Sequence, residues 1–236
     1  MASITANKLI IDYPILDSSS RSMKKMLFRA ATGGRIAADS RGISVRAIDG
    51  ISFTVSAGER IGLMGNNGAG KSTLLRAIAG VYAPTSGSLT VDGSVVSLID
   101  ISLGMDDEFS GYENIFMRSI FMGVSKAAVK NKTDEIIEFS GLGDYIKMPM
   151  RTYSSGMRLR LAFSVCTSFP ADIVLMDEWL SVGDSDFKEL AEKRLADFIS
   201  KSSILVLASH SIKQVRKMCT KVIILESGSI SENRPL

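Results

Sequence analysis

The residues best suited to bind phosphate lie at positions 65–73, between a short apolar run and a helical pattern. They read Gly65, Asn66, Asn67, Gly68, Ala69, Gly70, Lys71, Ser72 and Thr73, which matches the phosphate-binding pattern G-x-x-x-x-G-K-[ST]. Glycines let the backbone curl so that successive N–H groups point at phosphate oxygens, and the N-terminus of the following helix adds positive potential. In this pattern the lysine reaches the β- and γ-phosphates and the serine hydroxyl binds Mg²⁺. The loop therefore predicts a site for a nucleoside triphosphate.

A pair of acidic residues follows a four-residue apolar run. Ile173–Met176 predicts a buried strand, and Asp177 and Glu178 come directly after it. Ligands of open α/β sheets bind at the carboxyl ends of the strands, where these two carboxylates would lie. Asp177 fits a residue that holds Mg²⁺ through water, and Glu178 fits the general base that polarises the attacking water. Alone, such a pair is more often a helix cap or a solvated turn, but the phosphate loop in the same chain favours catalysis.

The chain contains a single histidine, His210, which follows the apolar run Ile204–Ala208. By itself, a histidine after a buried strand is more often a structural residue. Here its strand is expected to run beside the strand that ends at Asp177, which brings His210 to the same edge of the sheet. A neutral imidazole there could donate to the γ-phosphate or orient the attacking water.

Short β-branched runs alternate with longer helical patterns, which predicts an α/β fold with a parallel core sheet. An antiparallel β layer is expected beside this core, and residues 106–150 are expected to form an inserted helical subdomain within a single domain, 1–236. The core strands are expected at Arg60–Met64, Ile173–Met176, Ile204–Ala208 and Val222–Leu225, and the antiparallel strands at Val45–Ile48, Ile51–Val55, Ser88–Val91 and Val95–Ile99. The helices are expected at Lys71–Ala79, Tyr112–Phe121, Lys126–Ser140, Ser185–Ser200 and Ile212–Cys219.

Residues 18–42 precede the core and have the character of an insertion. Apolar residues recur there at helical spacing among basic ones. The pattern predicts either a surface helix that covers part of the fold or an interfacial helix beside anionic lipid or a membrane partner. The basic residues are Arg21, Lys24, Lys25 and Arg29, and the apolar ones are Met23, Met26, Leu27 and Ala30.

The composition excludes several other classes of protein. The 236 residues include 28 Lys and Arg against 25 Asp and Glu, and the resulting charge of +3 is too small to indicate a nucleic-acid-binding domain. An apolar share of 45% supports a substantial core and excludes disorder as the main state. The two cysteines, Cys166 and Cys219, form no disulfide framework. Because neither a signal peptide nor an apolar run of roughly 18 residues is visible, we expect a soluble cytosolic chain.

These features together resemble the nucleotide-binding domain of ABC transporters, and a third motif is decisive. Residues 153–157 read Tyr-Ser-Ser-Gly-Met and are similar to the family's signature loop, usually written LSGGQ. Ser154 and Gly156 are kept, whereas Ser155 replaces the first glycine, and tyrosine and methionine replace the leucine and the glutamine. A serine at a helix N-terminus followed by glycine offers a hydroxyl and free N–H groups to an anion. In the family, that anion is the γ-phosphate of a nucleotide bound by the phosphate loop (the P-loop) of the other subunit.

The resemblance assigns roles to three further residues. Asp184 matches the aspartate of the family's D-loop, and Tyr13 takes the place of the aromatic residue that stacks on adenine. The family usually has a glutamine that contacts Mg²⁺ and water, but no glutamine occurs between Ile99 and Glu113. By its spacing Asp100 is the best stand-in for it. The resemblance implies a P-loop NTPase core of the ABC type and an ATPase that uses ATP and Mg²⁺.

Within the family, four stretches are similar to the ATPase subunits of bacterial exporters of lipid-linked polysaccharides, namely O-antigen, capsule and teichoic acid. They are residues 109–115, 153–157 and 179–184 and the insertion after Tyr13. The resemblance implies a homodimer docked through its helical subdomain on an integral-membrane permease, itself present in two copies, at the cytoplasmic face of the inner membrane. The transported substrate would be a lipid-linked glycan, with no nucleic acid as partner. Some members carry a C-terminal carbohydrate-binding domain, and this chain is expected to be the short form without it.

Three alternatives remain open. The chain could serve an exporter of another substrate, such as a drug or a lipoprotein. It could be a soluble ABC-type ATPase that acts on DNA or ribosomes, although it has neither heptad repeats nor a second P-loop. It could also be an interaction module that does not hydrolyse ATP. The presence of Lys71, Asp177, Glu178 and His210 argues against that, whereas the missing glutamine argues for it.

Overall fold

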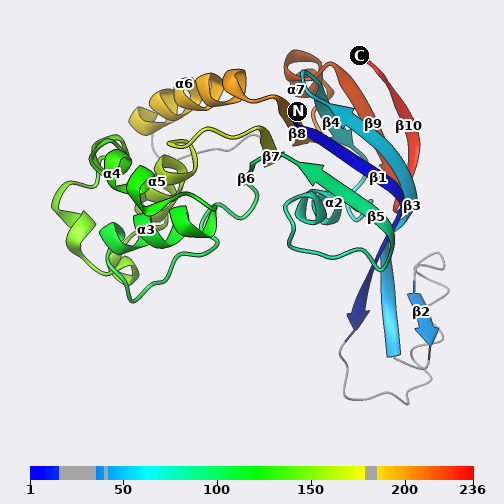
Figure 1. The fold of residues 1–236 in the computed structure, drawn as a ribbon, viewed down its shortest axis with the longest axis horizontal. Coiled ribbons are helices and arrows are strands. Elements are labelled where there is room, and N and C mark those ends of the chain that lie inside the picture. Colours follow the sequence, from blue (N-terminus) through cyan, green and yellow to red (C-terminus); the bar gives the residue numbers. More distant parts are fainter. Residues whose placement is uncertain (16–35, 40–41, 179–184) are drawn as a thin grey trace. The chain divides into compact units, whose positions relative to one another are not determined.

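The computed structural model describes residues 1–15, 36–39, 42–178 and 185–236, which divide into two compact units (Figure 1). The first unit comprises Met1–Asp92 and Val206–Leu236, and the second comprises Gly93–Leu205. Among the described helices, none is long and apolar enough to cross a bilayer.

The first unit contains a four-stranded antiparallel sheet in the order β2-β3-β1-β5. In β1 the residues Ile4 and Ala6, and then Leu9 and Ile11, are buried, so one face of the sheet meets the core. The alternation shifts by one residue where a β-bulge places Lys8 at a φ of 47°. The strands are β1 (Ser3–Ile15), β2 (Ile36–Asp39), β3 (Gly42–Ser56) and β5 (Ser86–Asp92).

The first unit also contains the strand that leads into the phosphate loop. This strand, β4 (Arg60–Met64), pairs in parallel with β9 (Lys221–Glu226), and β10 (Ser229–Pro235) lies antiparallel on the other side of β9. A Cβ atom added to Gly62 in β4 would lie 2.2 Å from Val215 Cγ1, so the glycine permits a close helix–strand approach. The helices of this unit are α2 (Lys71–Ile78) and α7 (Ile212–Met218), the latter carrying Val215.

The boundary between the units falls within β8 (Ile204–Ala208), whose five residues are all buried. At its start, the N–H groups of Ser203 and Ile204 donate to the carbonyl of Asp172 in the second unit, each at 2.9 Å. Just past its end, the Ser209 N–H donates to the Leu63 carbonyl in the first unit at 3.1 Å.

The second unit joins two parallel strands to a group of helices. β6 (Val95–Ser97) and β7 (Ile173–Asp177) pair in parallel. The helices pack around an apolar core that includes Ile115, Ile136 and Leu161. They are α3 (Gly111–Phe121), α4 (Lys126–Ser140), α5 (Ser155–Cys166) and α6 (Ser185–Lys201), with 3₁₀ turns η1 (Gly143–Lys147) and η2 (Met150–Thr152).

The expected α/β fold is confirmed, and each expected helix is present to within two residues at either end. The four expected core strands are also present. The strands expected at Val45–Ile48 and Ile51–Val55 are one continuous strand, β3, in which Gly50 has a φ of 65°. Part of the expected insertion, Ile36–Asp39, is strand β2 and pairs with β3, while the helix expected around residues 21–30 lies outside the described residues.

One expectation about the sheets was wrong. The run Val95–Ile99 was expected in the antiparallel layer, but β6 pairs in parallel with β7. The side chain of Asp172 accepts hydrogen bonds from both the N–H and the hydroxyl of Ser94, each at 2.8 Å, and so aligns the starts of the two strands. An apolar run shows that a strand forms, but its neighbour is determined by tertiary contacts of this kind.

Candidate nucleotide site

The phosphate loop follows β4 and opens α2, and its curvature depends on two glycines. Gly65 and Gly70 have φ values of 144° and 110°, in the region that glycine adopts readily. A Cβ atom would lie 2.2 Å from the Leu225 carbonyl oxygen at Gly65, and 2.7 Å from that of Ala47 at Gly70. Backbone geometry and the space around the loop therefore both require glycine here.

Lys71 lies inside the curl of this loop and is only 7% exposed. Its ammonium group donates to the carbonyl oxygens of Gly65 at 2.7 Å and Asn66 at 3.1 Å. Carbonyl groups are neutral acceptors, so these bonds hold the ammonium in place without cancelling its charge. The loop thus holds a positive charge beside backbone N–H groups, the arrangement that binds phosphate.

A turn between β9 and β10 supports the loop from the other side. The Gly228 N–H donates to the Ala69 carbonyl at 3.0 Å, and the Gly228 carbonyl accepts from the Asp49 N–H at 2.9 Å. Gly228 has a φ of 86°, which favours glycine. A turn at Gly228 is expected from the sequence, because glycine follows the apolar run Val222–Leu225 closely, but its contact with the phosphate loop is not.

Tyr13, on β1, contacts the end of the phosphate loop. Its hydroxyl donates to Thr73 Oγ1 at 3.1 Å, and its ring meets that of Tyr82 edge to face at 5.0 Å. Burial raises the pKa of the Tyr13 phenol above its usual value, although the bond to Thr73 opposes this shift. The phenol is therefore neutral and can donate at physiological pH. The structure places Tyr13 beside the phosphate loop, whereas its contact with adenine stays a prediction.

His210 lies in the turn between β8 and α7 and is exposed. The preceding Ser209 is held at three points: its N–H donates to Leu63, its hydroxyl donates to Gln214 Oε1 at 2.9 Å, and its Oγ accepts from the Ser211 N–H at 3.0 Å. Leu63 is two residues before Gly65. The backbone at His210 is thus tied to the strand that enters the phosphate loop.

The acidic pair belongs to the second unit. Asp177 is the last residue of β7, and Glu178 follows it, exposed, with a φ of 63°. A non-glycine residue in this conformation costs roughly 1–2 kcal/mol, and such strain is concentrated at functional sites. Asp184, predicted to lie in the D-loop, is outside the described residues.

The signature loop of the second unit forms the N-terminus of α5. Ser154 caps the helix, its Oγ accepting from the Met157 N–H at 3.2 Å. Ser154 and Ser155 are exposed, and a Cβ atom added to Gly156 would have only the Ser154 hydroxyl within 4 Å, at 3.8 Å. The N-terminus of α5 therefore carries exposed serine hydroxyls together with helix N–H groups, which are suited to meet an anion.

The tyrosine that replaces the family's leucine, Tyr153, is buried in the helical core. Its hydroxyl donates to the carbonyl of Tyr145 at 2.6 Å, so burial leaves no unsatisfied polar group. A Cβ atom on Gly111 would lie 2.2 Å from that hydroxyl, so the glycine at the start of α3 makes room for it. The substitution leaves Ser154 in its capping position.

Asp100, the expected stand-in for the missing glutamine, lies in a turn after β6 and is exposed. Its carbonyl accepts from the Leu103 N–H at 2.9 Å, which closes the turn. Its contact with Mg²⁺ stays a prediction.

Comparisons with known proteins show the family of the chain. The family described as "ABC transporter" matches residues 48–181. The O-antigen export system ATP-binding protein RfbE of Yersinia enterocolitica is 46% identical over 234 residues, which cover 98% of each chain. The corresponding protein RfbB of Myxococcus xanthus is 40% identical over 89% of this chain and 47% of its own length. The teichoic acids export protein TagH of Bacillus cereus is 41% identical over 81% of this chain and 35% of its own length.

Solved structures show the same fold. An ATP-binding subunit of an ABC transporter gives a TM-score of 0.70 at 16% identity, covering 99% of this chain and 90% of the other. A dimeric ATP-binding cassette in a post-hydrolysis state, bound to ADP and Pi, gives 0.69 at 17% identity, covering 99% and 98%.

The fold and the phosphate loop define a P-loop NTPase that binds and hydrolyses ATP. The chain belongs to the ABC transporter family, as the matched residues and the close relative show and as the signature loop predicted.

Proposed function

We propose that this chain is the ATP-hydrolysing subunit of an exporter that moves a lipid-linked polysaccharide of the O-antigen or capsule type across the inner membrane. The observation that carries this proposal is the 46% identity to an O-antigen export ATP-binding protein over 98% of both chains. Other relatives are teichoic acids export ATP-binding proteins. The relatives do not favour export of a drug or lipoprotein, or a soluble role on DNA or ribosomes.

In the proposed reaction, loop 65–73 holds the phosphates of ATP and Lys71 neutralises charge as the γ-phosphate leaves. Glu178 accepts a proton from the attacking water, and His210 contacts the γ-phosphate or orients that water. Mg²⁺, when bound, would add positive charge at the β- and γ-phosphates. Ser72 and Asp177 would hold it, with Asp100 as a further contact, and their oxygens are donors of the kind that Mg²⁺ prefers.

We propose that the working form is a homodimer in which each ATP lies between two chains. One chain contributes loop 65–73, and the other contributes Ser154, Ser155 and Gly156. The capped, exposed N-terminus of α5 supports this role, because a helix N-terminus offers N–H groups and positive potential to a negative charge. Tyr13 would stack on adenine and Asp184 would act at the dimer interface.

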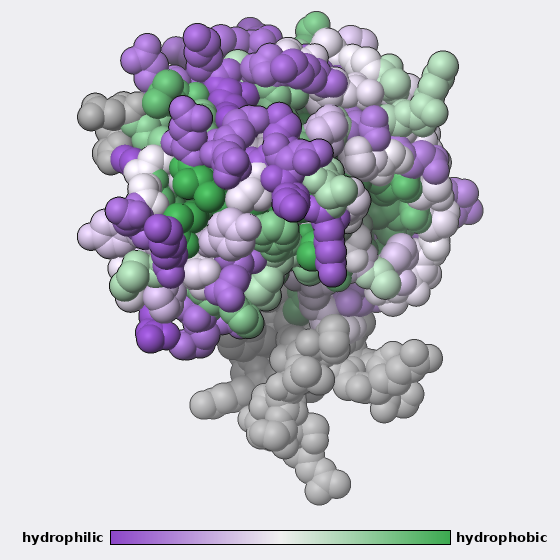
Figure 2. All heavy atoms as spheres, turned by 60° about the vertical axis from the view of Figure 1, so that its left-hand side comes forward, coloured by the Kyte–Doolittle hydropathy of each residue, from purple (hydrophilic) through white to green (hydrophobic). Residues whose placement is uncertain are grey.

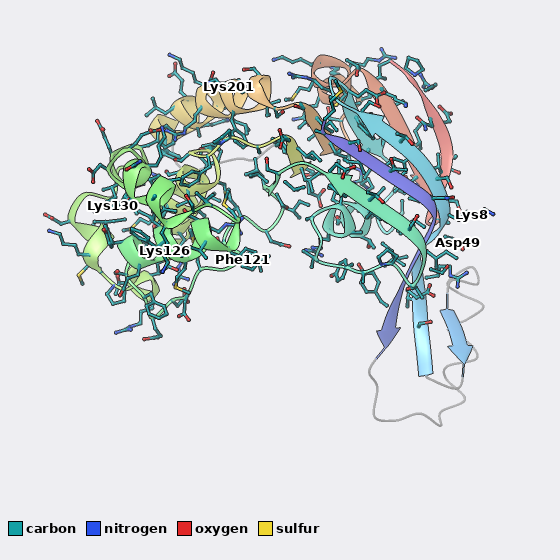
Figure 3. The ribbon with its side chains drawn as sticks, viewed as in Figure 1. Lys8, Asp49, Phe121, Lys126, Lys130 and Lys201 are labelled. Atoms are coloured by element: carbon teal, nitrogen blue, oxygen red, sulfur yellow. The ribbon has the colours of Figure 1, made fainter. Side chains whose placement is uncertain are left out.

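The second unit would dock on the separate permease, of which two copies are expected. Apolar side chains are exposed on α3 and before it, and Phe121 is 61% exposed at the helix C-terminus (Figure 3). A Cβ atom on Gly104 would lie 3.0 Å from the Phe121 ring, so the segment carrying Leu103 packs beside that ring. Figure 2 shows hydrophobic patches between hydrophilic side chains on the face of the molecule turned to the viewer. The exposed apolar residues are Leu103, Phe109, Tyr112, Met117, Ile120 and Phe121. This docking would place the chain peripherally at the cytoplasmic face of the inner membrane.

The test is Glu178→Gln. We expect ATP binding to persist and turnover to fall at least 10²-fold, the usual share of a general base. In the host, a lipid-linked glycan should accumulate inside the cell, where extraction and mass spectrometry would identify it. Glu189→Gln, on exposed α6 surface, is the matched control and should change neither result. Retained turnover would refute the role of Glu178, and loss of turnover without glycan accumulation would refute the export assignment.

A further inference from the structure

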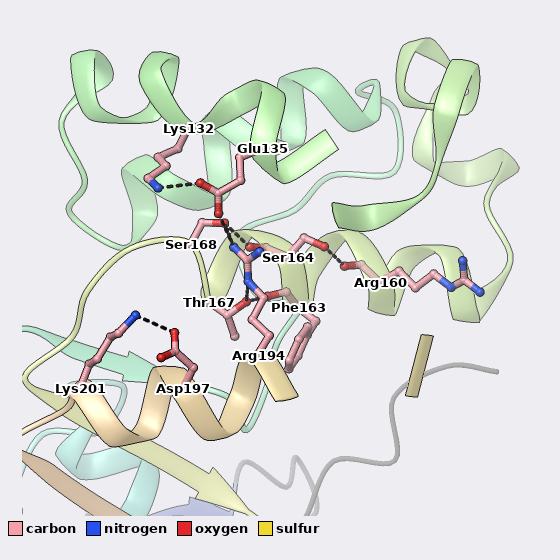
Figure 4. Close-up of polar contacts among 10 residues, drawn as sticks. All are labelled: Lys132, Glu135, Arg160, Phe163, Ser164, Thr167, Ser168, Arg194, Asp197 and Lys201. Carbon is pink, nitrogen blue, oxygen red and sulfur yellow. Dashed lines mark hydrogen bonds and ion pairs between the residues drawn. The ribbon is translucent and has the colours of Figure 1, made fainter. Parts of the chain in front are cut away.

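A partly buried cation holds the C-terminal end of α5, the helix that begins at the signature loop. Arg194 projects from α6 and only 17% of its side chain is exposed. Its guanidinium donates to Thr167 Oγ1 at 3.0 Å and to Ser168 Oγ at 2.8 Å, the two residues that follow α5 (Figure 4). The planar group with its fixed fork of donors is suited to grip two hydroxyls at once.

The same guanidinium reaches α4. It donates to Glu135 Oε1 at 3.0 Å and lies over the ring of Phe139, 4.1 Å from its centroid. Glu135 also accepts from Lys132 at 2.6 Å (Figure 4). Hydrogen bonding to Lys132 and the charge of Arg194 lower the pKa of Glu135, so this carboxylate is ionised at physiological pH. Arg194 therefore joins three helices through one side chain.

A second cation, which lies on α5 itself, attaches the first half of this helix to α6. The Arg160 guanidinium lies 5.0 Å from the ring centroid of Phe187, in the first turn of α6. Phe187 also meets Phe163 of α5 at 6.2 Å and Phe139 of α4 at 5.5 Å, both edge to face. Thus α5 is attached to α6 near the signature loop and again beyond its C-terminus.

These attachments determine the direction in which α5 presents its N-terminus. A helix of 12 residues is about 18 Å long, so tilting it by about 5° around its C-terminal end would move the signature loop by about 1.5 Å. A misplacement of about 1 Å at a reacting centre can cost about 100-fold in rate. Contacts that fix the C-terminal end of α5, the end farthest from Ser154, therefore strongly affect the position of the signature loop.

We propose that Arg194 is a positioning residue. By fixing α5 to α4 and α6, it holds the signature loop in the orientation that contacts the nucleotide bound by the partner chain. This rests on the proposed sandwich dimer. All the contacts involved belong to the second unit, so loss of Arg194 should spare the phosphate loop of its own chain.

The experiment uses the full chain carrying Glu178→Gln, so that ATP is bound but not turned over. Fluorescent ATP measures the nucleotide Kd of the single chain, and analytical ultracentrifugation with Mg-ATP measures the dimer dissociation constant. For Arg194→Met we expect an unchanged nucleotide Kd, within twofold, and a dimer at least tenfold weaker. Arg194→Lys keeps the charge but not the planar fork of donors. Its dimer dissociation constant should lie between that of the chain with Arg194 and that of Arg194→Met.

Lys201→Met is the matched control, because this cation lies on the same helix in an exposed ion pair with Asp197. It should change neither constant. Phe187→Leu is a second test that keeps the site apolar while removing the ring under Arg160, and it should weaken the dimer in the same selective way.

Three outcomes separate the possibilities. If the Glu178→Gln chain with Arg194 intact forms no ATP-dependent dimer, the sandwich in the proposed function is wrong. If it does and Arg194→Met dimerises equally well, the positioning role is wrong. Arg194→Met and Phe187→Leu could also both lose nucleotide binding and dimerisation to the same extent. That result would show that these residues have a general structural role, and it would overturn the positioning role of Arg194.

Discussion

At the scale of single residues, the phosphate loop depends on side chains that are held in place by their neighbours. The Lys71 side chain is buried, and its ammonium group donates to the carbonyl oxygens of Gly65 and Asn66. Burial raises the pKa of the Tyr13 phenol, and its hydroxyl donates to Thr73 Oγ1 beside the same loop. The loop lysine is therefore already placed where it can meet a phosphate.

Lys71→Met should fold but lose catalysis. Methionine preserves the length of the buried side chain but removes the charge, so turnover should fall by about 10²–10³-fold, as when one transition-state donor is removed. A phosphate-release assay measures the effect, and Lys130→Met on the exposed face of α4 is the control. Turnover within threefold of the parent protein would contradict the role of Lys71.

Cys219 should resist alkylation in the folded protein. Burial raises its pKa to about 12, which leaves roughly 10³-fold less thiolate at pH 8.5 than an ordinary thiol has. Because the folded pKa lies above the unfolded one, the associated stability is present below about pH 9 and is lost as the pH rises towards 12. Iodoacetamide labelling followed by mass spectrometry should modify Cys219 slowly when native and readily in urea. Rapid native labelling would count against this burial.

At the scale of elements, sequence patterns predicted where helices and strands form more accurately than they predicted which strands pair with one another. The apolar runs at Ile173–Met176 and Ile204–Ala208 predicted strands correctly, because continuous apolar runs of that length form buried strands. The run at Val95 also formed a strand, but its pairing with β7 depends on tertiary contacts such as that between Ser94 and Asp172. The long strand β1 was not expected, because a bulge at Lys8 breaks its alternation.

The start of α3 offers a test of element stability. Asn114 is fully buried, and its side chain accepts from the Asp106 N–H at 2.7 Å and donates to carbonyls of the same loop, that of Asp106 at 2.8 Å and that of Ser110 at 3.0 Å. Asn114→Ala leaves these backbone groups unsatisfied, which should cost about 2–3 kcal/mol. Urea unfolding measures the loss, with exposed Asn131→Ala as control. An unchanged urea midpoint would mean that the loop finds other partners.

At the scale of the whole molecule, the residues assigned to ATP chemistry are distributed over two units. The first carries the phosphate loop, Tyr13 and His210, and the second carries the acidic pair and the signature loop. In the proposed dimer one chain supplies the parts of two half-sites, so catalysis would depend on assembly as well as on folding.

Nucleotide binding should therefore be measurable as stability. In the Glu178→Gln protein, Mg-ATP at 100 times its Kd should raise the free energy of unfolding by about 2.7 kcal/mol. Thermal unfolding with and without nucleotide measures the shift. The shift should disappear when Lys71→Met is added, and a shift that persists would place the nucleotide elsewhere.

The sequence alone predicted a protein that hydrolyses ATP, and the family match agrees with it, because the glycine spacing and lysine of the phosphate loop form a local pattern. It also predicted the α/β class, since hydrophobic periodicity sets the type of each element. Tertiary structure alone decided how these parts are held: Gly228 under the phosphate loop, Tyr153 within the helical core, and Arg194 across three helices. Such contacts join residues far apart in sequence, so no local pattern encodes them.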